Sequence, residues 1–188
     1  MSKFRLPIRT ERLVLRDLLP SDLEALHACT SDPGVTHFMY YAPMSLSQTE
    51  QYLREMIAAQ LLRPRRAWEL AIVRSADGVV LGACDITLNE PGAGDLGYLL
   101  ARFAWGYGYA TEAACAMVRE GFETLGLERI DGLCHIEHLA SAHVLEKAGL
   151  LHERLLRSYK TVKGEPWDML LYSRTRDAWR AAHQPGQP

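Results

Sequence analysis

The sequence predicts a single mixed α/β domain. Its 188 residues, 48% of them hydrophobic, can build one substantial core but leave little room for a second full domain. Stretches that alternate as strands do and stretches with the apolar spacing of helices follow one another along the chain without an internal repeat. We therefore expect one domain over residues 1–182 and a disordered tail over residues 183–188.

The first quarter of the chain predicts a strand and two helices. Residues 9–17 alternate as a strand should, and the Pro-Ser-Asp sequence at residues 20–22 then begins a helix. The Ser-Asp-Pro-Gly sequence at residues 31–34 predicts a turn. A second helix is expected over residues 47–62, because its apolar residues recur on one face.

The middle of the chain predicts three strands. Residues 68–74 and 79–89 have strand-like patterns, and the Asp77-Gly78 pair between them favours a tight hairpin turn. A third strand is expected over residues 95–100, after the glycine-containing turn at residues 91–94.

The last third begins with a helix over residues 109–125, which Gly126 ends in the position where glycine commonly follows a helix. The elements expected after it are a strand over residues 129–135, a short helix over residues 141–147 and a hairpin formed by residues 154–161 and 167–173. The whole order of elements is that of a mixed α/β (α+β) domain.

The composition favours a cytoplasmic protein that does not bind polyanions through its overall charge. There are 21 Lys and Arg against 23 Asp and Glu, so no general attraction to nucleic acid or to an anionic membrane is expected. Arg5 and Pro7 interrupt the apolar run that a signal peptide requires, and no later run approaches membrane-spanning length. The four cysteines are too scattered for a zinc or redox pair, so we expect reduced thiols and no metal.

One glycine-containing segment, Trp105-Gly106-Tyr107-Gly108-Tyr109-Ala110-Thr111, joins a predicted strand to a predicted helix. Unpaired N–H groups at a helix start, reinforced by the helix dipole, bind phosphate. Gly106 and Gly108 have no side chain to block close approach, and Thr111 adds a hydroxyl donor. Arg102, just before the segment, is a candidate bidentate partner for a phosphate.

The spacing of this segment alone is a weak indication of function. It lacks the Gly-Lys-Ser/Thr ending of the nucleotide P-loop, and its glycines do not have the spacing of the dinucleotide fingerprint. A glycine-rich turn that only begins a helix is an equal alternative. For Arg102 the alternative is a solvated charge at a strand end.

Three segments taken together resemble the RimJ/RimL branch of the GNAT acetyltransferases. They are Leu-Gly-Tyr-Leu-Leu at residues 96–100, Trp-Gly-Tyr-Gly-Tyr-Ala-Thr-Glu-Ala at residues 105–113 and Ser-Ala-His-Val-Leu-Glu-Lys-Ala-Gly-Leu at residues 141–150. The likeness extends from residues 10–16 near the start to residues 168–173 near the end, so it covers most of the chain.

The resemblance implies a mixed, mostly antiparallel sheet that splays open and holds acetyl-CoA between the strands that end at Leu100 and near His135. The pantetheine arm would pair with the strand at residues 98–100, where the N–H groups of Leu99 and Leu100 would polarise the thioester carbonyl. The cofactor-binding residues expected on this basis are Tyr98, Leu99, Leu100, Arg102, Trp105, Gly106, Tyr107, Gly108, Tyr109, Ala110, Thr111, His138 and Ser141.

Two residues depart from the family pattern. His138 stands where the family usually carries Asn three residues before the serine, so a cofactor-side contact is replaced or lost there. Lys160 stands where members that acetylate N-terminal peptides can place a Glu near the acceptor amine. The second departure weakens the case for a ribosomal-protein substrate.

Direct acetyl transfer requires a neutral amine, a polarised thioester and a proton for the departing thiolate. By resemblance, Ser141 would supply that proton, although a helix N-cap is an alternative and compatible role. Asp85 and His135, and less strongly Glu137, are candidates to accept the amine proton because their strands should flank the cleft. A structural role is the alternative for each of them.

These observations favour an enzyme that acetylates a primary amine directly from acetyl-CoA. Because no strong base stands out, we expect the α-amine of a protein, peptide or amino acid, which is only weakly basic, to be preferred. Another small-molecule amine and a non-catalytic acyl-CoA-binding module are the alternatives. The aromatic segment at residues 37–44 would form the acceptor wall or a lid packed on the core, and the resemblance makes a homodimer possible.

Overall fold

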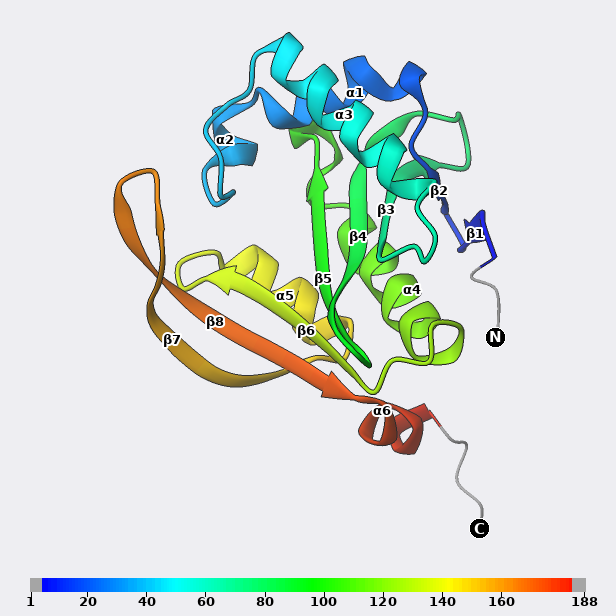
Figure 1. The fold of residues 1–188 in the computed structure, drawn as a ribbon, viewed down its shortest axis with the longest axis vertical. Helices are drawn as coiled ribbons and strands as arrows, with labels where there is room; N and C mark the ends of the chain where they lie inside the picture. The colour runs from blue at the N-terminus through cyan, green and yellow to red at the C-terminus, as the bar shows by residue number, and fades with distance from the viewer. Residues whose placement is uncertain (1–4, 184–188) are drawn as a thin grey trace.

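The computed structural model describes residues 5–183, which form one eight-stranded sheet between two layers of helices (Figure 1). The strand order is β1-β2-β3-β4-β5-β6-β8-β7, and neighbouring strands are antiparallel except β5 and β6, which run parallel. The strands are β1 (Ile8–Arg9), β2 (Leu13–Asp17), β3 (Ala67–Arg74), β4 (Val80–Glu90), β5 (Ala93–Leu100), β6 (Arg129–His135), β7 (Leu151–Val162) and β8 (Glu165–Thr175). The mixed α/β fold predicted from the sequence is confirmed.

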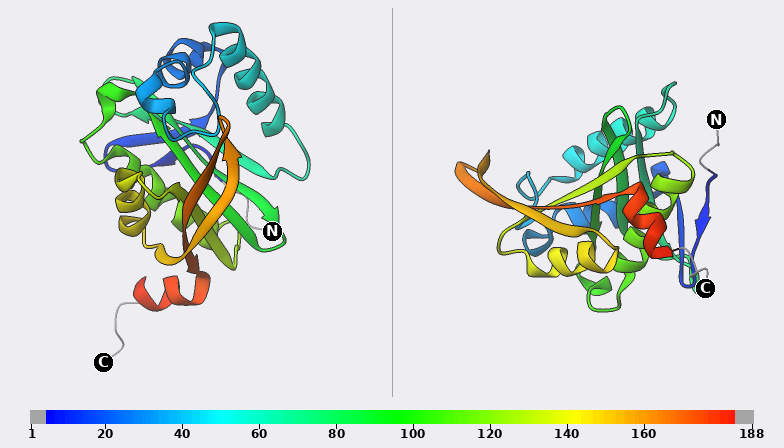
Figure 2. Two further views of the ribbon diagram at one scale, coloured as in Figure 1. Left: turned by 90° about the vertical axis from the view of Figure 1, so that its left-hand side faces the viewer. Right: turned by 90° about the horizontal axis from the view of Figure 1, so that it is seen from below.

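Helices cover both faces of the sheet. Seen from below, α1 and α3 lie on one side of it and α4 and α5 on the other (Figure 2, right). The helices are α1 (Leu23–Thr30), α2 (Pro33–Thr36), α3 (Leu46–Gln60), α4 (Tyr109–Glu123), α5 (Leu139–Lys147) and α6 (Arg176–His183), with short 3-10 turns η1 (Pro20–Asp22) and η2 (Arg102–Ala104). None of the helices in the described part of the chain is both long and apolar enough to cross a membrane.

Successive side chains of the central strands face opposite helix layers, as a strand requires. Leu70 and Ile86 belong to the large core cluster that contains the buried residues of α4. Ala71 and Val73 belong to a second cluster with Leu53 of α3. Residues of β3 and β4 that share the orientation of Ala71 therefore face α3.

The sheet splits between β5 and β6. The two strands pair only over Ala93–Asp95 and Arg129–Asp131, and beyond this point each continues without the other. Figure 1 shows the two ribbons diverging upward from their paired ends. The edge of β5 over residues 96–100 that faces β6 is consequently free of strand pairing, which agrees with the splayed sheet implied by the resemblance.

The N-terminal strand expected over residues 9–17 is two short strands instead. Ile8 pairs with Leu15 in an antiparallel hairpin, and Thr10 closes the turn through its N–H to the Leu13 carbonyl at 3.0 Å. Thr10 and Arg12 of this turn both donate to the side chain of Glu112 on α4, which holds the turn between the two strands.

The chain ends differently from the sequence expectation. Residues 176–183 form α6, whose Trp179 is buried and lies with its ring centroid 5.4 Å from that of Phe122. His183 is the last residue of this helix. The rest of the expected tail, residues 184–188, lies outside the described residues.

Candidate active site

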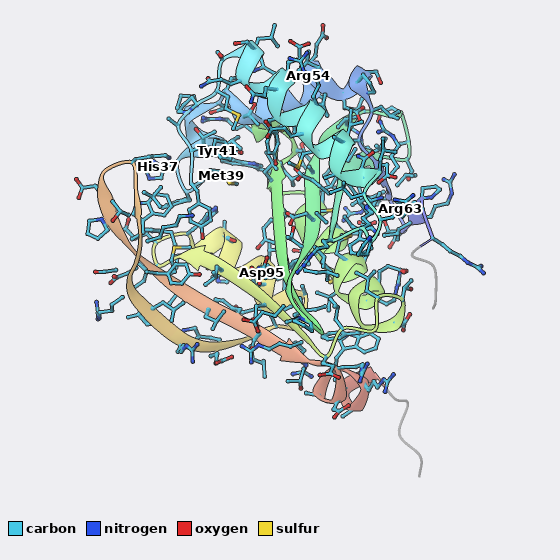
Figure 3. The ribbon with its side chains drawn as sticks, viewed as in Figure 1. His37, Met39, Tyr41, Arg54, Arg63 and Asp95 are labelled. Carbon is cyan, nitrogen blue, oxygen red and sulfur yellow. The ribbon has the colours of Figure 1, made fainter. Side chains whose placement is uncertain are left out.

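A cavity of about 650 Å³ lies at the split of the sheet and continues to the loop after α2. Thirteen of the expected site residues line it: Asp85, Tyr98, Leu99, Leu100, Trp105, Gly106, Gly108, Tyr109, Ala110, Thr111, His135, His138 and Ser141. Met39 and Tyr41 of the loop and Asp95 of β5 also line it, and Figure 3 shows Asp95 below the two loop residues. The cavity thus joins the glycine segment to the aromatic segment at residues 38–41.

The glycine segment forms an open cradle at the start of α4. Gly106 and Gly108 have φ angles of +82° and +80°, in the left-handed region that favours glycine. A Cβ at Gly106 would have no neighbour within 4 Å, and one at Gly108 would meet only Arg12 Nη2, at 3.6 Å. Gly108 is the N-cap of α4 and offers no side chain to its first N–H groups. The space in front of these donors suits an anionic group.

A cluster of polar contacts fixes this helix start to the N-terminal hairpin. Glu112 accepts from Thr10 Oγ1 at 2.6 Å and from the Arg12 N–H at 2.8 Å, and it pairs with Arg12 Nε at 2.7 Å. Arg12 Nη1 also donates to the Tyr107 carbonyl at 2.9 Å. The Thr-Glu-Arg motif near the N-terminus therefore positions the cradle from 100 residues away in the sequence.

Ser141 and Tyr98 form a hydroxyl pair on the α5 side of the split. Tyr98 Oη lies 2.9 Å from the Ser141 carbonyl, to which it donates, and 2.9 Å from Ser141 Oγ. Since Tyr98 has one proton, its bond to the carbonyl leaves the Ser141 hydroxyl as the donor in the second contact. Burial raises the pKa of Tyr98, so its hydroxyl stays protonated.

His138, and not Ser141, caps α5. The helix begins at Leu139, and His138 Nδ1 accepts from the Ser141 N–H at 3.3 Å. Burial, with smaller contributions from His135 and His37, lowers the pKa of His138, which favours the neutral ring that such a bond needs. The N-cap alternative for Ser141 is thereby removed, because His138 is the capping residue of α5.

Asp85, on β4, lines the cavity from the face of the sheet that α3 covers. It is directly opposite Glu69 across β3 and β4, and Thr87 Oγ1 donates to its Oδ2 at 3.2 Å. Burial, then the negative charge of Glu69, raises the pKa of Asp85 to about 7. This carboxyl group can accept and release a proton near neutral pH.

An aromatic cluster forms the wall between the loop and the β7–β8 hairpin. The Phe38 ring stacks on His135 with a centroid distance of 5.2 Å, and His135 meets Trp167 edge-on at 4.9 Å. Lys163, at the hairpin tip, donates to the Thr36 carbonyl at 2.7 Å and so ties the hairpin to the loop. His135 is thus enclosed by rings, which agrees with its structural alternative as well as with a place in the cavity.

Four candidate residues lie away from the cavity lining. Arg102 is bound by Asp32, through Nε to Oδ2 at 2.9 Å and Nη2 to Oδ1 at 2.5 Å, and is not a free charge at a strand end. Tyr107 is 63% exposed. Glu137 is exposed, and Lys160 places its Nζ 4.6 Å from the centre of the Tyr40 ring.

The residue that sequence reasoning missed is Glu69, which lines the cavity together with Tyr52 of α3. The one sequence feature that could have indicated Glu69 is that it is the single charged residue in the apolar segment Trp68-Glu69-Leu70-Ala71-Ile72-Val73. An acidic residue in such a run must find a polar partner or a function when the strand is buried.

Comparisons with known proteins give the class of protein that this fold and cavity define. The family model for the Acetyltransferase (GNAT) domain matches residues 12–151. The uncharacterized N-acetyltransferase p20 of Bacillus licheniformis is 32% identical over 166 residues, which cover 87% of this chain and 93% of that protein. The chain belongs to the GNAT acetyltransferase family and is an acyltransferase.

Solved structures share the fold. A GNAT-family acetyltransferase from Bacillus anthracis superposes with a TM-score of 0.84 at 24% identity, covering 92% of this chain and 99% of that one. RimL, described as a ribosomal L7/L12 alpha-N-protein acetyltransferase in complex with coenzyme A, superposes with a TM-score of 0.79 at 19% identity. The superposition with RimL covers 90% of this chain and 97% of the RimL chain.

Proposed function

We propose that this protein transfers an acetyl group from acetyl-CoA directly to the α-amine of a peptide, protein or amino acid. The observation that carries the proposal is that one cavity is lined by groups suited to giving and to taking a proton. Ser141 and Tyr98 lie on the α5 side, and Asp85 lies on the α3 side. A proton donor and a proton acceptor that line one cavity suit a reaction in which one bond breaks as another forms.

The residues present fit acetyl-CoA. The N–H groups at the start of α4, with the open cradle at Gly106 and Gly108, would hold the pyrophosphate. The unpaired edge of β5 at residues 98–100 would pair with the pantetheine arm as an added strand would. Acetyl-CoA would supply the activated acetyl thioester.

Three groups of this chain would then act in the transfer. Asp85 accepts one proton from the ammonium form of the amine, and the Leu100 N–H, which points to the free edge of β5, stabilises negative charge on the carbonyl oxygen. Ser141 donates a proton to the departing sulfur, and Tyr98 holds the Ser141 hydroxyl in place. The C–N bond forms as the C–S bond breaks, and the second amine proton replaces the one that Ser141 gives up.

The expected acceptor follows from the proton affinity of Asp85. A carboxyl group with a pKa of about 7 lies about 1 pH unit below an α-amine and about 3.4 pH units below a lysine amine. At about 1.36 kcal/mol per unit, proton removal from lysine costs roughly 3 kcal/mol more. The sequence favours a weakly basic amine because it shows no evident strong base, and the pKa of Asp85 supports the same preference.

Placement in the RimJ/RimL branch is part of the proposal. It is supported by the sequence segments at residues 96–113 and 141–150 and by the shared fold with RimL. We also place the protein in the cytoplasm, because its four cysteines are free thiols, which fits a reducing compartment.

The acceptor preference is tested with two peptides of one sequence that differ only in which amine is free. One peptide has a free N-terminus and a blocked lysine, and the other has a blocked N-terminus and a free lysine. We expect kcat/KM at pH 7 to favour the α-amine at least tenfold. Equal rates on the two peptides would contradict the proposed acceptor class while leaving acetyl transfer in place.

A further inference from the structure

Glu69 and Asp85 form a pair of carboxyl groups on the acceptor side of the cavity. They are direct cross-strand neighbours on β3 and β4, and antiparallel neighbours point to the same face of a sheet. Both side chains line the cavity. Two carboxylates at this spacing would repel each other unless one of them holds a proton or both receive hydrogen bonds.

Tyr52 distinguishes the two members of the pair. It lies on α3 and donates from its hydroxyl to Glu69 Oε1 at 2.5 Å. Burial raises the pKa of Glu69, whereas the Tyr52 hydrogen bond opposes that rise. The hydrogen bond therefore keeps the negative charge on Glu69 and leaves Asp85 as the member that gains and loses the proton.

Gly97 directs Asp85 toward the split. Gly97 is the cross-strand neighbour of Asp85 on β5, and a Cβ at this position would collide with Asp85 Oδ1. The missing side chain lets the carboxyl group lean over the backbone of β5, two residues before Leu99. Asp85 thereby lies beside the strand segment that the proposed reaction uses.

We propose that Glu69 is a positioning residue, which, anchored by Tyr52, makes Asp85 a proton acceptor strong enough for an amine that enters the cavity as an ammonium ion. The inference rests on the proposed function. Asp85 takes one proton from the ammonium group, which leaves the neutral amine free to attack, and later releases that proton to solvent. Glu69 touches neither the amine nor the thioester in this scheme and acts only through Asp85.

Other titratable groups on this face contribute less. Tyr41 lies on the loop and Tyr52 on α3, and burial raises the pKa of both, so neither carries charge near neutral pH. Asp95 on β5 adds to the rise at Asp85, but less than burial and Glu69 do. The pH dependence of the reaction should accordingly follow the Glu69–Asp85 pair.

The test compares pH profiles of kcat/KM for the wild type, Glu69→Gln and Tyr52→Phe, with Asp85→Asn to identify the base. Glu90→Gln, an exposed carboxylate at the end of β4, is the matched control. The acidic limb of the profile is the fall in kcat/KM at low pH. We expect Glu69→Gln to move this limb about one pH unit lower, because the pKa of Asp85 falls when the neighbouring charge is removed. The maximal kcat/KM should fall about fivefold, because Asp85 is then a weaker base. Tyr52→Phe should move the limb in the same direction by less, and Glu90→Gln should leave it unchanged.

If Glu69 had only a structural role, Glu69→Gln would lower kcat/KM equally at every pH. An acidic limb at the same pH in Glu69→Gln and in the wild type would therefore overturn the inference. Retention of the acidic limb in Asp85→Asn would overturn it as well. Titration of the Asp85 carboxyl by ¹³C NMR in the unliganded protein needs no turnover and should show the same downward change in Glu69→Gln. If the wild type acetylates no amine while this titration changes as expected, the proposed function fails and the carboxyl pair stands.

Discussion

At the scale of single residues, the Ser141–Tyr98 pair is the feature with the most direct chemical consequence. The Ser141 hydroxyl donates to Tyr98 Oη at 2.9 Å, and it would turn from Tyr98 to the departing sulfur to give up its proton. We expect Ser141→Ala to lower kcat about a hundredfold with little change in the KM for acetyl-CoA, because proton donation matters in the transition state. Tyr98→Phe should lower kcat about fivefold, the value of one hydrogen bond of about 1 kcal/mol. A raised KM with unchanged kcat in Ser141→Ala would make Ser141 a binding contact only.

His138 gives the stability of the protein a specific pH dependence. Its pKa is lower in the folded protein than its usual value, so the neutral cap stabilises the fold fully above about pH 6.5. As the pH falls through the folded pKa, the ring is protonated, Nδ1 can no longer accept, and the positive charge opposes the helix dipole.

We therefore expect His138→Asn, a cap that does not titrate, to lose less stability than the wild type between pH 7 and pH 5. The difference should be on the order of 1 kcal/mol, the typical worth of an N-cap. Urea unfolding at both pH values measures it, with His143→Asn on the same helix as the control. Parallel losses in the wild type and His138→Asn would show that the ring does not act as the cap.

At the scale of elements, the start of α4 and its end provide a matched pair of glycines. Gly108 and Gly126 have φ angles of +80° and +69°, and neither would place a Cβ in close contact with the rest of the protein. Alanine should cost about 1 kcal/mol of stability at either position, since both require the left-handed conformation. Only Gly108→Ala should weaken coenzyme A binding, at least tenfold by calorimetry, because its methyl group projects into the cradle. Equal affinity in the two variants would contradict the assignment of the pyrophosphate site.

At the scale of the whole molecule, the sequence predicts elements well where the determining contacts are local. The Asp77-Gly78 turn, the helix from Tyr109 and the final hairpin all depend on neighbours in the sequence, and all lie within a few residues of their expected bounds. α6 was missed because its place depends on the contact of Trp179 with Phe122, 57 positions earlier. The split of the sheet, likewise, came from the family resemblance and not from periodicity.

In the site, too, features that depend on local sequence could be predicted and those that depend on long-range contacts could not. The glycine segment and Ser141 could be found because short motifs carry them, whereas Glu69 meets Tyr52 only through the packing of α3 on the sheet. The pairing of Arg102 with Asp32, 70 residues away, could not be read from the sequence, and the phosphate contact of Arg102 stays a prediction. Dimer formation stays a prediction.

The most direct test of the proposed reaction is its stoichiometry with an α-amine peptide. Free coenzyme A thiol and N-acetyl peptide are quantified from the same reaction mixture, by thiol titration and by mass spectrometry. Direct transfer predicts equal amounts of the two products, with both rates lowered together in Asp85→Asn. Tight binding of coenzyme A without thiol release, or thiol release without acetylated peptide, would contradict the account.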